Sequence, residues 1–184
     1  MNKFTLGAVV IICAALLVGC SNRSAYVPQH SFGAQPLPNM PSISLERVAY
    51  IPFLKGEVLE TQLQSDGFVT LHINAPIAVA SRHAIESMLK ESGVLSESGT
   101  SVLRLQVDIL ELKSLTAMQP IFNCRVVYKL SDSASGELKF SRNYIDIRSY
   151  PLSLSGVDFS QVVQEIIAGT YNQFATDIQT WNNK

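Results

Sequence analysis

The sequence predicts an α+β domain in which two amphipathic helices pack on one face of a small, mostly antiparallel sheet of four to five strands. Two stretches, 77–89 and 163–181, repeat apolar residues at helical spacing. Three stretches between them, 102–112, 121–130 and 138–147, alternate apolar and polar residues as half-buried strands do. We expect these three strands to lie side by side, because consecutive alternating segments commonly pair as hairpins.

Two further strand candidates precede the first helix. Residues 48–51 (VAYI) form a β-prone run that stops at Pro52, which cannot donate a ladder hydrogen bond. Residues 68–73 (FVTLHI) alternate and predict a second strand. The mixed segment 53–66 between them predicts a loop, or an irregular strand around Val58 and Leu59.

The first helix is predicted between Asn74 and Gly93. Asn74 is a favoured N-cap type, Pro76 is tolerated in a first helical turn, and Gly93 can end the helix in a left-handed conformation. His83 falls away from most of the apolar stripe and is expected at the surface. The stripe consists of Ile77, Ala80, Ala84, Ile85, Met88 and Leu89.

The stretch 102–112 contains the clearest strand pattern. Its apolar phase changes after Ile109, where Leu110 and Leu112 become the apolar positions, and this change predicts a β-bulge or a strong twist near Ile109 and Leu110. The face opposite the helices is expected to be solvated or to bind something. That face would carry Arg104, Gln106, Arg125, Val127 and Lys129.

The next two strands form a predicted hairpin around the turn cluster 131–136 (SDSASG). Cys124 alternates with apolar residues of the first of these strands, so we expect it in the core as a small hydrophobe; a catalytic thiol is the alternative. The second strand, 138–147, changes phase near Arg142 and Asn143.

The last helix is predicted to begin at Asp158, which forms a capping-box pattern with Gln161. Gly169 interrupts the helix at a cost of about 1 kcal/mol against alanine, so it predicts a close approach to the sheet. Core packing is the expected role of the apolar stripe; the alternative is an exposed docking face around Tyr171 and Trp181. The stripe consists of Val163, Ile166, Ile167, Thr170, Phe174, Ile178 and Trp181.

The N-terminus predicts an export signal. Lys3 precedes an uncharged run of 16 residues, 4–19, shorter than the about 20 that a spanning helix needs. The exit LVGC, residues 17–20, resembles the lipobox of bacterial lipoproteins. This resemblance implies that Cys20 receives a diacylglycerol, with fatty acyl chains such as palmitate, and becomes the first residue of the mature chain. An uncleaved anchor helix or a buried N-terminal helix is the alternative.

The resemblance also implies a destination. In that class an aspartate after the cysteine tends to retain the protein at the inner membrane, and this chain has Ser21 instead. We therefore expect a lipid anchor in the outer membrane with the domain facing the periplasm. The predicted organisation is a signal peptide at 1–19, the lipidated cysteine and a disordered Pro-rich tether at 20–41, and one domain at 42–184.

Composition and motifs predict no catalytic residues, cofactor or metal. Removing residues 1–19, which contain one lysine, leaves 13 basic and 15 acidic residues, without a basic field for nucleic acid. G-x-S-x-G, H-E-x-x-H and P-loop motifs do not occur in the sequence. The histidines are scattered at His30, His72 and His83, and so are the carboxylates Glu57, Glu60, Asp66, Glu86, Glu91, Asp108 and Asp146.

The order of elements resembles a group of small periplasmic lipoproteins. RVAYIPFL, HAIESMLKESGVL, LRLQVDILEL, CRVVYKLSDSASGELKFSRNYI and FSQVVQEIIAGTYNQFATDI follow one another as in the ABC-type transport auxiliary lipoprotein family, which serves MCE-type intermembrane lipid transport. YajG-like lipoproteins share much of this order, and the lipoprotein partner of the lipopolysaccharide-assembly barrel also has two helices on a small sheet. The resemblance covers about 42–181 by pattern and carries over no site residues.

These observations together predict a non-enzymatic outer-membrane lipoprotein that binds a protein partner in envelope transport, with lipid transport as the specific expectation. Two alternatives remain open. One is a lipid- or peptidoglycan-binding module, and the other is a structural or assembly lipoprotein of a secretion or surface complex.

Overall fold

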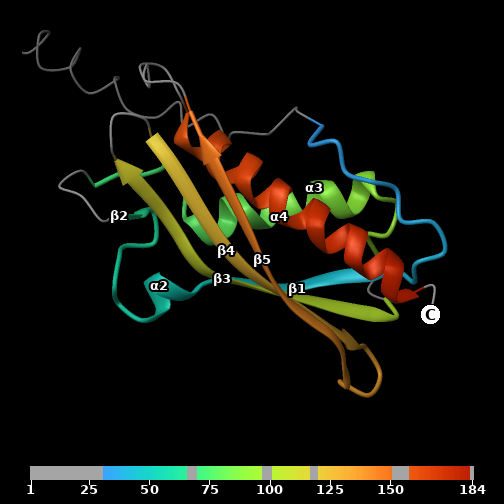
Figure 1. The fold of residues 1–184 in the computed structure, drawn as a ribbon. Coiled ribbons are helices and arrows are strands. Elements are labelled where there is room, and N and C mark those ends of the chain that lie inside the picture. The colour runs from blue at the N-terminus through green and yellow to red at the C-terminus, as the bar shows by residue number, and fades with distance from the viewer. Residues whose placement is uncertain (1–30, 66–69, 97–100, 117–119, 151–157, 183–184) are drawn as a thin grey trace, which may run out of the picture. The chain divides into compact units, whose positions relative to one another are not determined.

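The computed structural model describes residues 31–65, 70–96, 101–116, 120–150 and 158–182. It confirms the α+β class: one five-stranded, mostly antiparallel sheet and two substantial helices (Figure 1). The elements are, in chain order, β1 (Ile43–Tyr50), α2 (Ile51–Leu54), β2 (Gln64–Ser65), α3 (Ile77–Glu91), β3 (Leu103–Thr116), β4 (Pro120–Asp132), β5 (Leu138–Ser149) and α4 (Phe159–Asn182).

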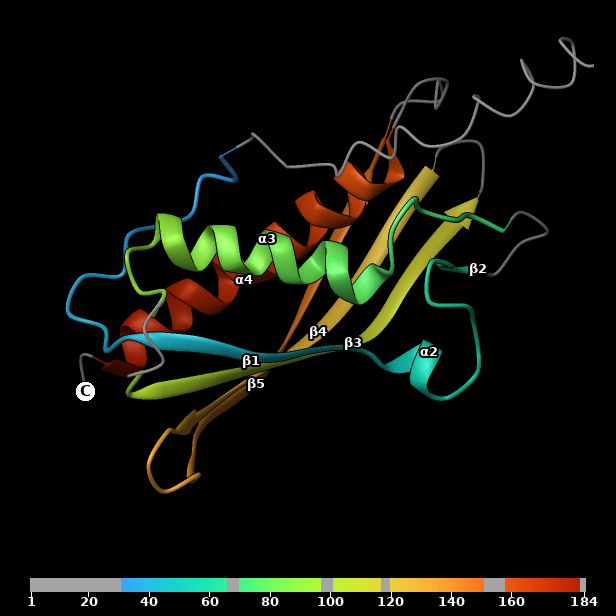
Figure 2. The same cartoon turned by 180° about the vertical axis from the view of Figure 1, so that it is seen from behind.

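The sheet has the order β1-β3-β4-β5, with β2 also paired to β3. As predicted, β3, β4 and β5 are antiparallel neighbours. β1 runs parallel to β3, which requires a crossover connection, and α3 lies within that connection. Both long helices cover the same face of the sheet, and Figure 2, which is turned by 180° from Figure 1, shows them in front of the strands.

The predicted bulge in β3 is present. The pairing of β3 with β4 shifts register between Ile109 and Glu111, so Leu110 is the extra residue. A bulge reverses which side chains face the core, because side chains alternate along a strand. Leu105, Val107 and Ile109 are therefore buried before it, and Leu112 after it.

The N-terminal strand predictions need correction. β1 begins at Ile43, and Pro52 lies in the first turn of the short helix α2 instead of simply ending a strand. Of the two alternatives for 53–66, the loop is confirmed at Val58 and Leu59 and the irregular strand there is wrong. The short strand β2 forms at Gln64 and Ser65.

The predicted strand at 68–73 is also wrong in its described part, 70–73, while 68–69 lie outside the described residues. Only an isolated bridge forms there, between Gln62 and His72. The backbone pairs locally instead: Leu63 N donates to the Leu71 carbonyl (3.0 Å) and Ile73 N to the Thr61 carbonyl (2.9 Å). This local pairing replaces a ladder with the sheet.

The helix ends follow the predicted signals in part. Gly93 adopts a φ of 75° after α3, as expected for a left-handed closure. The N-cap position of α3 is Pro76, so the assignment of Asn74 as N-cap is wrong. At α4, Asp158 Oδ1 accepts a hydrogen bond from Ser160 N (2.8 Å), but the Gln161 amide bonds to Glu165 (2.9 Å), so the capping box is not formed.

The phase change expected near Arg142 and Asn143 is displaced. β4 and β5 pair without a shift from Leu130 opposite Phe140 to Ile121 opposite Ser149. The irregularity lies at the turn end of the hairpin, between Leu130 and Ser131.

Aromatic side chains fill the core between the sheet and α4. Tyr128 stacks on Phe174 with ring centroids 4.8 Å apart, and its hydroxyl lies 2.9 Å from Thr170 Oγ1. Tyr171 is fully buried, so its proposed place in an exposed docking face is wrong. Trp181 is half-buried, with its ring 6.2 Å from the ring of Phe140.

Gly169 confirms the predicted close approach of α4 to the sheet. A Cβ atom at this position would collide with the Asp146 carboxylate and lie 2.7 Å from Arg148 Nη2. These two side chains form an ion pair (2.8 Å) on the helix-facing side of β5. The missing side chain therefore makes room for that pair.

Gly169→Ala is expected to have opposite effects in two backgrounds. In the native chain the collision with Asp146 is expected to offset or exceed the about 1 kcal/mol of helix propensity gained. With Asp146→Ala present, the collision with the carboxylate is removed, and Arg148, which meets the new Cβ with the end of a flexible side chain, can move aside, so the same change is expected to stabilise. A double-mutant cycle in urea should give a coupling of about 1 kcal/mol or more; additive effects would contradict the close approach.

Residues 31–41, expected in the tether, contain residues that contact the helix α3. Ser31 Oγ and the backbone N–H groups of Phe32 and Ala34 donate to the Glu91 carboxylate at 3.2–3.3 Å. Leu37 is 3% exposed. Residues 31–41 therefore pack against the domain that was predicted to start at 42.

Candidate partner-binding surface

The open face of the sheet, opposite the helices, contains a first ionic cluster around Asp108. Its side chain is only 8% exposed and lies 2.7 Å from Arg47 Nη2 and 2.8 Å from Lys129 Nζ. The two cations are partly exposed, the Arg47 side chain by 52% and that of Lys129 by 38%. The cluster links β1, β3 and β4, so it holds three neighbouring strands in register.

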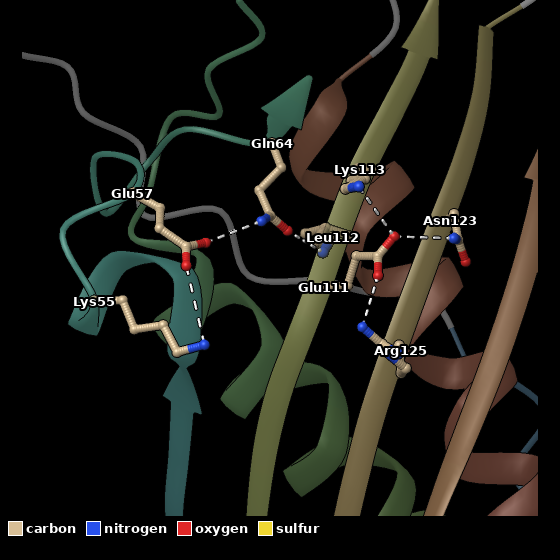
Figure 3. Close-up of polar contacts among 8 residues, drawn as sticks. All are labelled: Lys55, Glu57, Gln64, Glu111, Leu112, Lys113, Asn123 and Arg125. Carbon is tan, nitrogen blue, oxygen red and sulfur yellow. Dashed lines mark hydrogen bonds and ion pairs between the residues drawn. The ribbon is translucent and has the colours of Figure 1, made fainter. Parts of the chain in front are cut away.

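A second cluster surrounds Glu111, just beyond the bulge (Figure 3). Its carboxylate accepts hydrogen bonds from Arg125 Nη2 (3.0 Å) and Asn123 Nδ2 (3.2 Å), and Lys113 Nζ lies 3.7 Å away. Arg125 pairs directly opposite Glu111 in the β3–β4 ladder. Cross-strand pairs of opposite charge stabilise a sheet by about 0.2–1 kcal/mol each.

Gln64 bridges the point where β3 changes its neighbour. The pairing with β1 ends at Ile109 and the pairing with β2 begins at Lys113. In the gap, the backbone N–H of Leu112 donates to Gln64 Oε1 (3.2 Å), as Figure 3 shows. The Gln64 amide in turn donates to Glu57 (3.3 Å), whose carboxylate lies 3.9 Å from Lys55 Nζ.

The structure places all five predicted open-face residues on that face, and it shows which groups the four polar ones contact. Arg104 donates to the Ser133 carbonyl (2.7 Å) and Gln106 to Glu46 (3.2 Å), while Arg125 and Lys129 bind the two central carboxylates. Sequence reasoning missed Asp108 and Glu111 as centres of this network. For Asp108 the sequence contained a signal: it follows Arg104 and Gln106 at two-residue spacing, which places all three side chains on one face of the strand.

β5 presents an uncharged strip to the same face. Because side chains alternate, the residues between those that contact α4 point to the open face. Two of them are large and apolar: Ile145 is 51% exposed and Ile147 is 62% exposed. The strip consists of Ser141, Asn143, Ile145, Ile147 and Ser149.

A pocket of about 300 Å³ lies between β5 and the last turns of α4. Within it, Asp177 Oδ2 accepts hydrogen bonds from Arg142 Nη1 (2.6 Å) and from the Tyr144 hydroxyl (2.8 Å). The hydrogen bond from Arg142, followed by that from Tyr144, lowers the pKa of Asp177 below its usual value. The lining residues are Lys139, Phe140, Ser141, Arg142, Asp177, Thr180 and Trp181.

The lowered pKa of Asp177 predicts a loss of stability in acid. A carboxyl group with a depressed folded-state pKa stabilises the fold above its unfolded pKa of about 3.9, and this contribution disappears as pH falls through the folded-state value. Urea unfolding from pH 6 to pH 2.5 should show a smaller decline for Asp177→Asn than for the native chain. Thr176→Ala, exposed on the same helix, should keep the native decline; equal declines in Asp177→Asn would contradict the assignment.

The described histidines do not gather. His72 is exposed, with Nδ1 3.3 Å from Thr61 Oγ1, and His83 is exposed on α3, as predicted; His30 lies outside the described residues. In the described part of the chain, no group of three or more His, Cys, Asp or Glu side chains could hold a metal ion.

Cys124 is buried in β4, which confirms its predicted place in the core. Burial raises the pKa of its thiol far above the usual value, with smaller contributions from Asp146 and Glu111. The thiolate form is therefore disfavoured, and the thiolate is the nucleophilic form of cysteine.

Several of the scattered carboxylates are held in ion pairs. Glu86 pairs with Arg82 (2.9 Å) and Asp146 with Arg148 (2.8 Å), while Asp66 lies outside the described residues.

None of the helices that the structure describes has the length and apolarity to cross a membrane.

No protein-family model matches this sequence, and no curated protein matches it. Solved structures with a related arrangement include protein XCC0632 from Xanthomonas campestris, described as DUF330: 15% identity, 80% of this chain and 89% of that chain covered, TM-score 0.54. A PelC dodecamer from Paraburkholderia phytofirmans has 15% identity, 76% and 92% coverage and a TM-score of 0.43. A minor lipoprotein from Acinetobacter baumannii has 15% identity, 76% and 90% coverage and a TM-score of 0.39.

The likeness to XCC0632 shows a shared fold. Fold alone does not determine function, because function depends on the particular residues placed on the fold. The likeness to XCC0632 therefore assigns no function to this chain.

Proposed function

We propose that this chain is a non-enzymatic lipoprotein, anchored by lipid at Cys20 in the outer membrane, that binds a protein partner of an envelope transport system. Lipid transport is the specific system we propose. The observation that carries the anchor is the sequence LVGC at the end of a 16-residue uncharged run. The exposed Ile145 and Ile147 on the open face support the partner role, because exposed large apolar side chains that lie together mark interaction surfaces.

The mechanism would be tethering. A lipid at Cys20 confines the domain to the membrane surface, and confinement raises the effective concentration of a partner that is bound to the same membrane. Ten residues separate Cys20 from Ser31. Fully extended, they reach about 35 Å at 3.3–3.6 Å per residue, so the domain would remain close to its membrane.

The membrane assignment is tested by Ser21→Asp. If the resemblance to outer-membrane lipoproteins holds, the native chain is expected in the outer-membrane fraction of a sucrose gradient. The variant is expected to move to the inner-membrane fraction, and Ser24→Asp, three residues further on, should behave as the native chain. A native chain that sediments with the inner membrane would overturn the proposed location.

The partner is tested by in-cell crosslinking of the tagged full chain, followed by purification from detergent-solubilised membranes. The expected result is specific recovery of a subunit of an envelope transporter, lost when cells lack that transporter. Recovery of a large secretion complex would instead favour the structural alternative, and co-purified lipid in place of a protein would favour the binding-module alternative.

A further inference from the structure

The pocket between β5 and the end of α4 has an aromatic wall that the core holds in place. The Trp181 ring lies 6.2 Å from the Phe140 ring, which in turn lies 5.9 Å from the ring of the fully buried Phe174. Trp181 itself is only half-buried and lines the pocket. It therefore offers a ligand part of a flat apolar ring whose position is fixed by packing before the ligand arrives.

The same pocket contains a carboxylate with an unused acceptor atom. Both hydrogen bonds to Asp177, from Arg142 Nη1 (2.6 Å) and from the Tyr144 hydroxyl (2.8 Å), end on Oδ2. Among the residues that the structure describes, no side chain or backbone group donates to Oδ1. Tyr144 is buried, so one of the two groups that fix the carboxylate is itself held in the core. Asp177 therefore presents Oδ1 in a defined position.

Two further lining residues supply hydrogen-bonding groups. Arg142 has five N–H donors, and its side chain is 59% exposed, so the donors that Asp177 does not use are accessible. The Thr180 hydroxyl donates to the Thr176 carbonyl (3.1 Å), which leaves its oxygen as an acceptor. The pocket thus combines an apolar ring with both donors and acceptors.

The charges of the lining favour a neutral ligand. Arg142 is paired with Asp177 (2.6 Å), and Lys139 is paired with Glu137 (2.6 Å). A charged ligand would find no unpaired charge among these residues to neutralise it. An acyl chain would cover the ion pair without replacing the hydrogen bonds that water gives it, which is unfavourable. A neutral ligand with several hydroxyl groups meets neither obstacle.

The size and openness of the pocket fit one sugar ring. Its volume of about 300 Å³ lies at the lower end of the range of about 300–1,000 Å³ for small-molecule sites. A sugar ring has C–H groups on its faces, which gain by burial against an aromatic ring, and hydroxyl groups that both donate and accept. Because the side chains of Arg142 and Asp177 are partly exposed, such a ring could enter while joined to a longer chain.

We propose that this pocket binds one neutral sugar ring of an envelope glycan. The C–H face of the ring packs on Trp181, and its hydroxyl groups bond to Asp177 Oδ1 and Arg142, with Thr180 at the side. The glycan is a strand of the cell wall or the sugar headgroup of a lipid, which share this chemistry. The site uses neither Cys20 nor the open face of the sheet, so it goes beyond the proposed function and can fail without it.

Trp181 supplies a direct test, because it is the single tryptophan of the chain and its fluorescence reports on this pocket. The purified full chain, in a detergent without sugar headgroups, is titrated with the trisaccharide of N-acetylglucosamine and with maltotriose. The expected result is a saturable change in emission with at least one of them, and at least twofold less quenching by acrylamide at saturation. No change with either at about 10 mM, which would fill most of a site with a dissociation constant of about 1 mM, would overturn the proposal.

Two threonines of α4 provide a matched pair of variants. Thr180 and Thr176 are both exposed, and each donates its hydroxyl to the carbonyl four residues earlier, at 3.1 Å and 3.0 Å, but Thr180 lines the pocket. Thr180→Val is expected to weaken saccharide binding at least threefold, and Thr176→Val should leave it unchanged. Asp177→Asn should weaken it at least tenfold. Equal effects of the two threonine variants, with both proteins folded by circular dichroism, would overturn the proposal.

The remaining arms identify the source of the sugar and the nature of the ligand. Co-sedimentation of the solubilised chain with purified peptidoglycan sacculi would identify the cell wall. A change in Trp181 emission when a glucosyl diacylglycerol is added to the micelles would identify a lipid headgroup. A response to neither source would overturn the assignment to an envelope glycan. A response to inorganic phosphate in place of the saccharides would overturn the choice of a neutral ligand.

Discussion

Replacing Cys20 with alanine is expected to move nearly all of the protein from the membrane pellet to the soluble periplasmic fraction. The variant lacks the sulfur that would carry the diacylglycerol. Each buried methylene of an acyl chain contributes about 0.8 kcal/mol of membrane affinity, and stable anchoring requires more than one chain. Without the lipid, no described helix could replace the anchor by crossing the membrane.

Cys13→Ala is the matched control, because Cys13 lies in the segment that the export signal would remove. It should leave the protein in the membrane pellet, and incorporation of radiolabelled palmitate should be lost in Cys20→Ala alone. Retention of Cys20→Ala in carbonate-washed membranes would point to an uncleaved anchor helix and would contradict lipid anchoring.

Replacing Phe174 with alanine is expected to lower the free energy of unfolding by about 3–5 kcal/mol, the range for large buried aromatic residues. Phe174 is fully buried and contacts four other aromatic rings. It stacks on Tyr128, with ring centroids at 4.8 Å and an interplanar angle of 13°. The rings of Phe140, Tyr144 and Tyr171 lie at 5.7–6.4 Å. Its removal leaves a cavity between α4 and the sheet, and the aromatic contacts are lost as well.

The measurement is urea unfolding followed by circular dichroism. Thr176→Ala, two residues further along α4 and exposed, should change the free energy of unfolding by no more than about 0.5 kcal/mol. A loss below about 1 kcal/mol in Phe174→Ala would mean that this cluster does not form the core.

The sequence predicted those parts of the fold in which local pattern and burial agree. The alternation in β3 and β4 locates the core face directly, and even the bulge after Ile109 follows from the change in phase. Gly169 was also informative, because glycine weakens a helix and its place inside one therefore indicates close packing. In these strands the alternating apolar residues of the sequence are the residues that the structure buries.

The segment between β1 and α3 could not be predicted, because tertiary contacts determine it. β2 is only two residues long, and its place depends on the edge of β3 that β1 leaves free beyond Ile109. Residues 70–73 alternate like a strand but pair with their own loop. No local pattern distinguishes a segment that joins the main sheet from one that pairs with its own loop.

The open-face network shows the same limit. The sequence placed Arg125 and Lys129 on one face, but their carboxylate partners Glu111 and Asp108 depend on the register of β3 against β4. Arg47 joins the network only because β1 is parallel to β3, which the sequence did not reveal. Which face a residue occupies follows from periodicity, whereas its partners follow from topology.

The contact of residues 31–34 with Glu91 has a mechanical consequence. Under tension from the N-terminal side, the load reaches these three exposed hydrogen bonds of 3.2–3.3 Å before it reaches the buried Leu37 and then β1. They are expected to break first and to release residues 31–36. Fully extended, those six residues would lengthen the tether by about 20 Å at 3.3–3.6 Å each. The segment would therefore detach and extend under tension while the sheet remains folded.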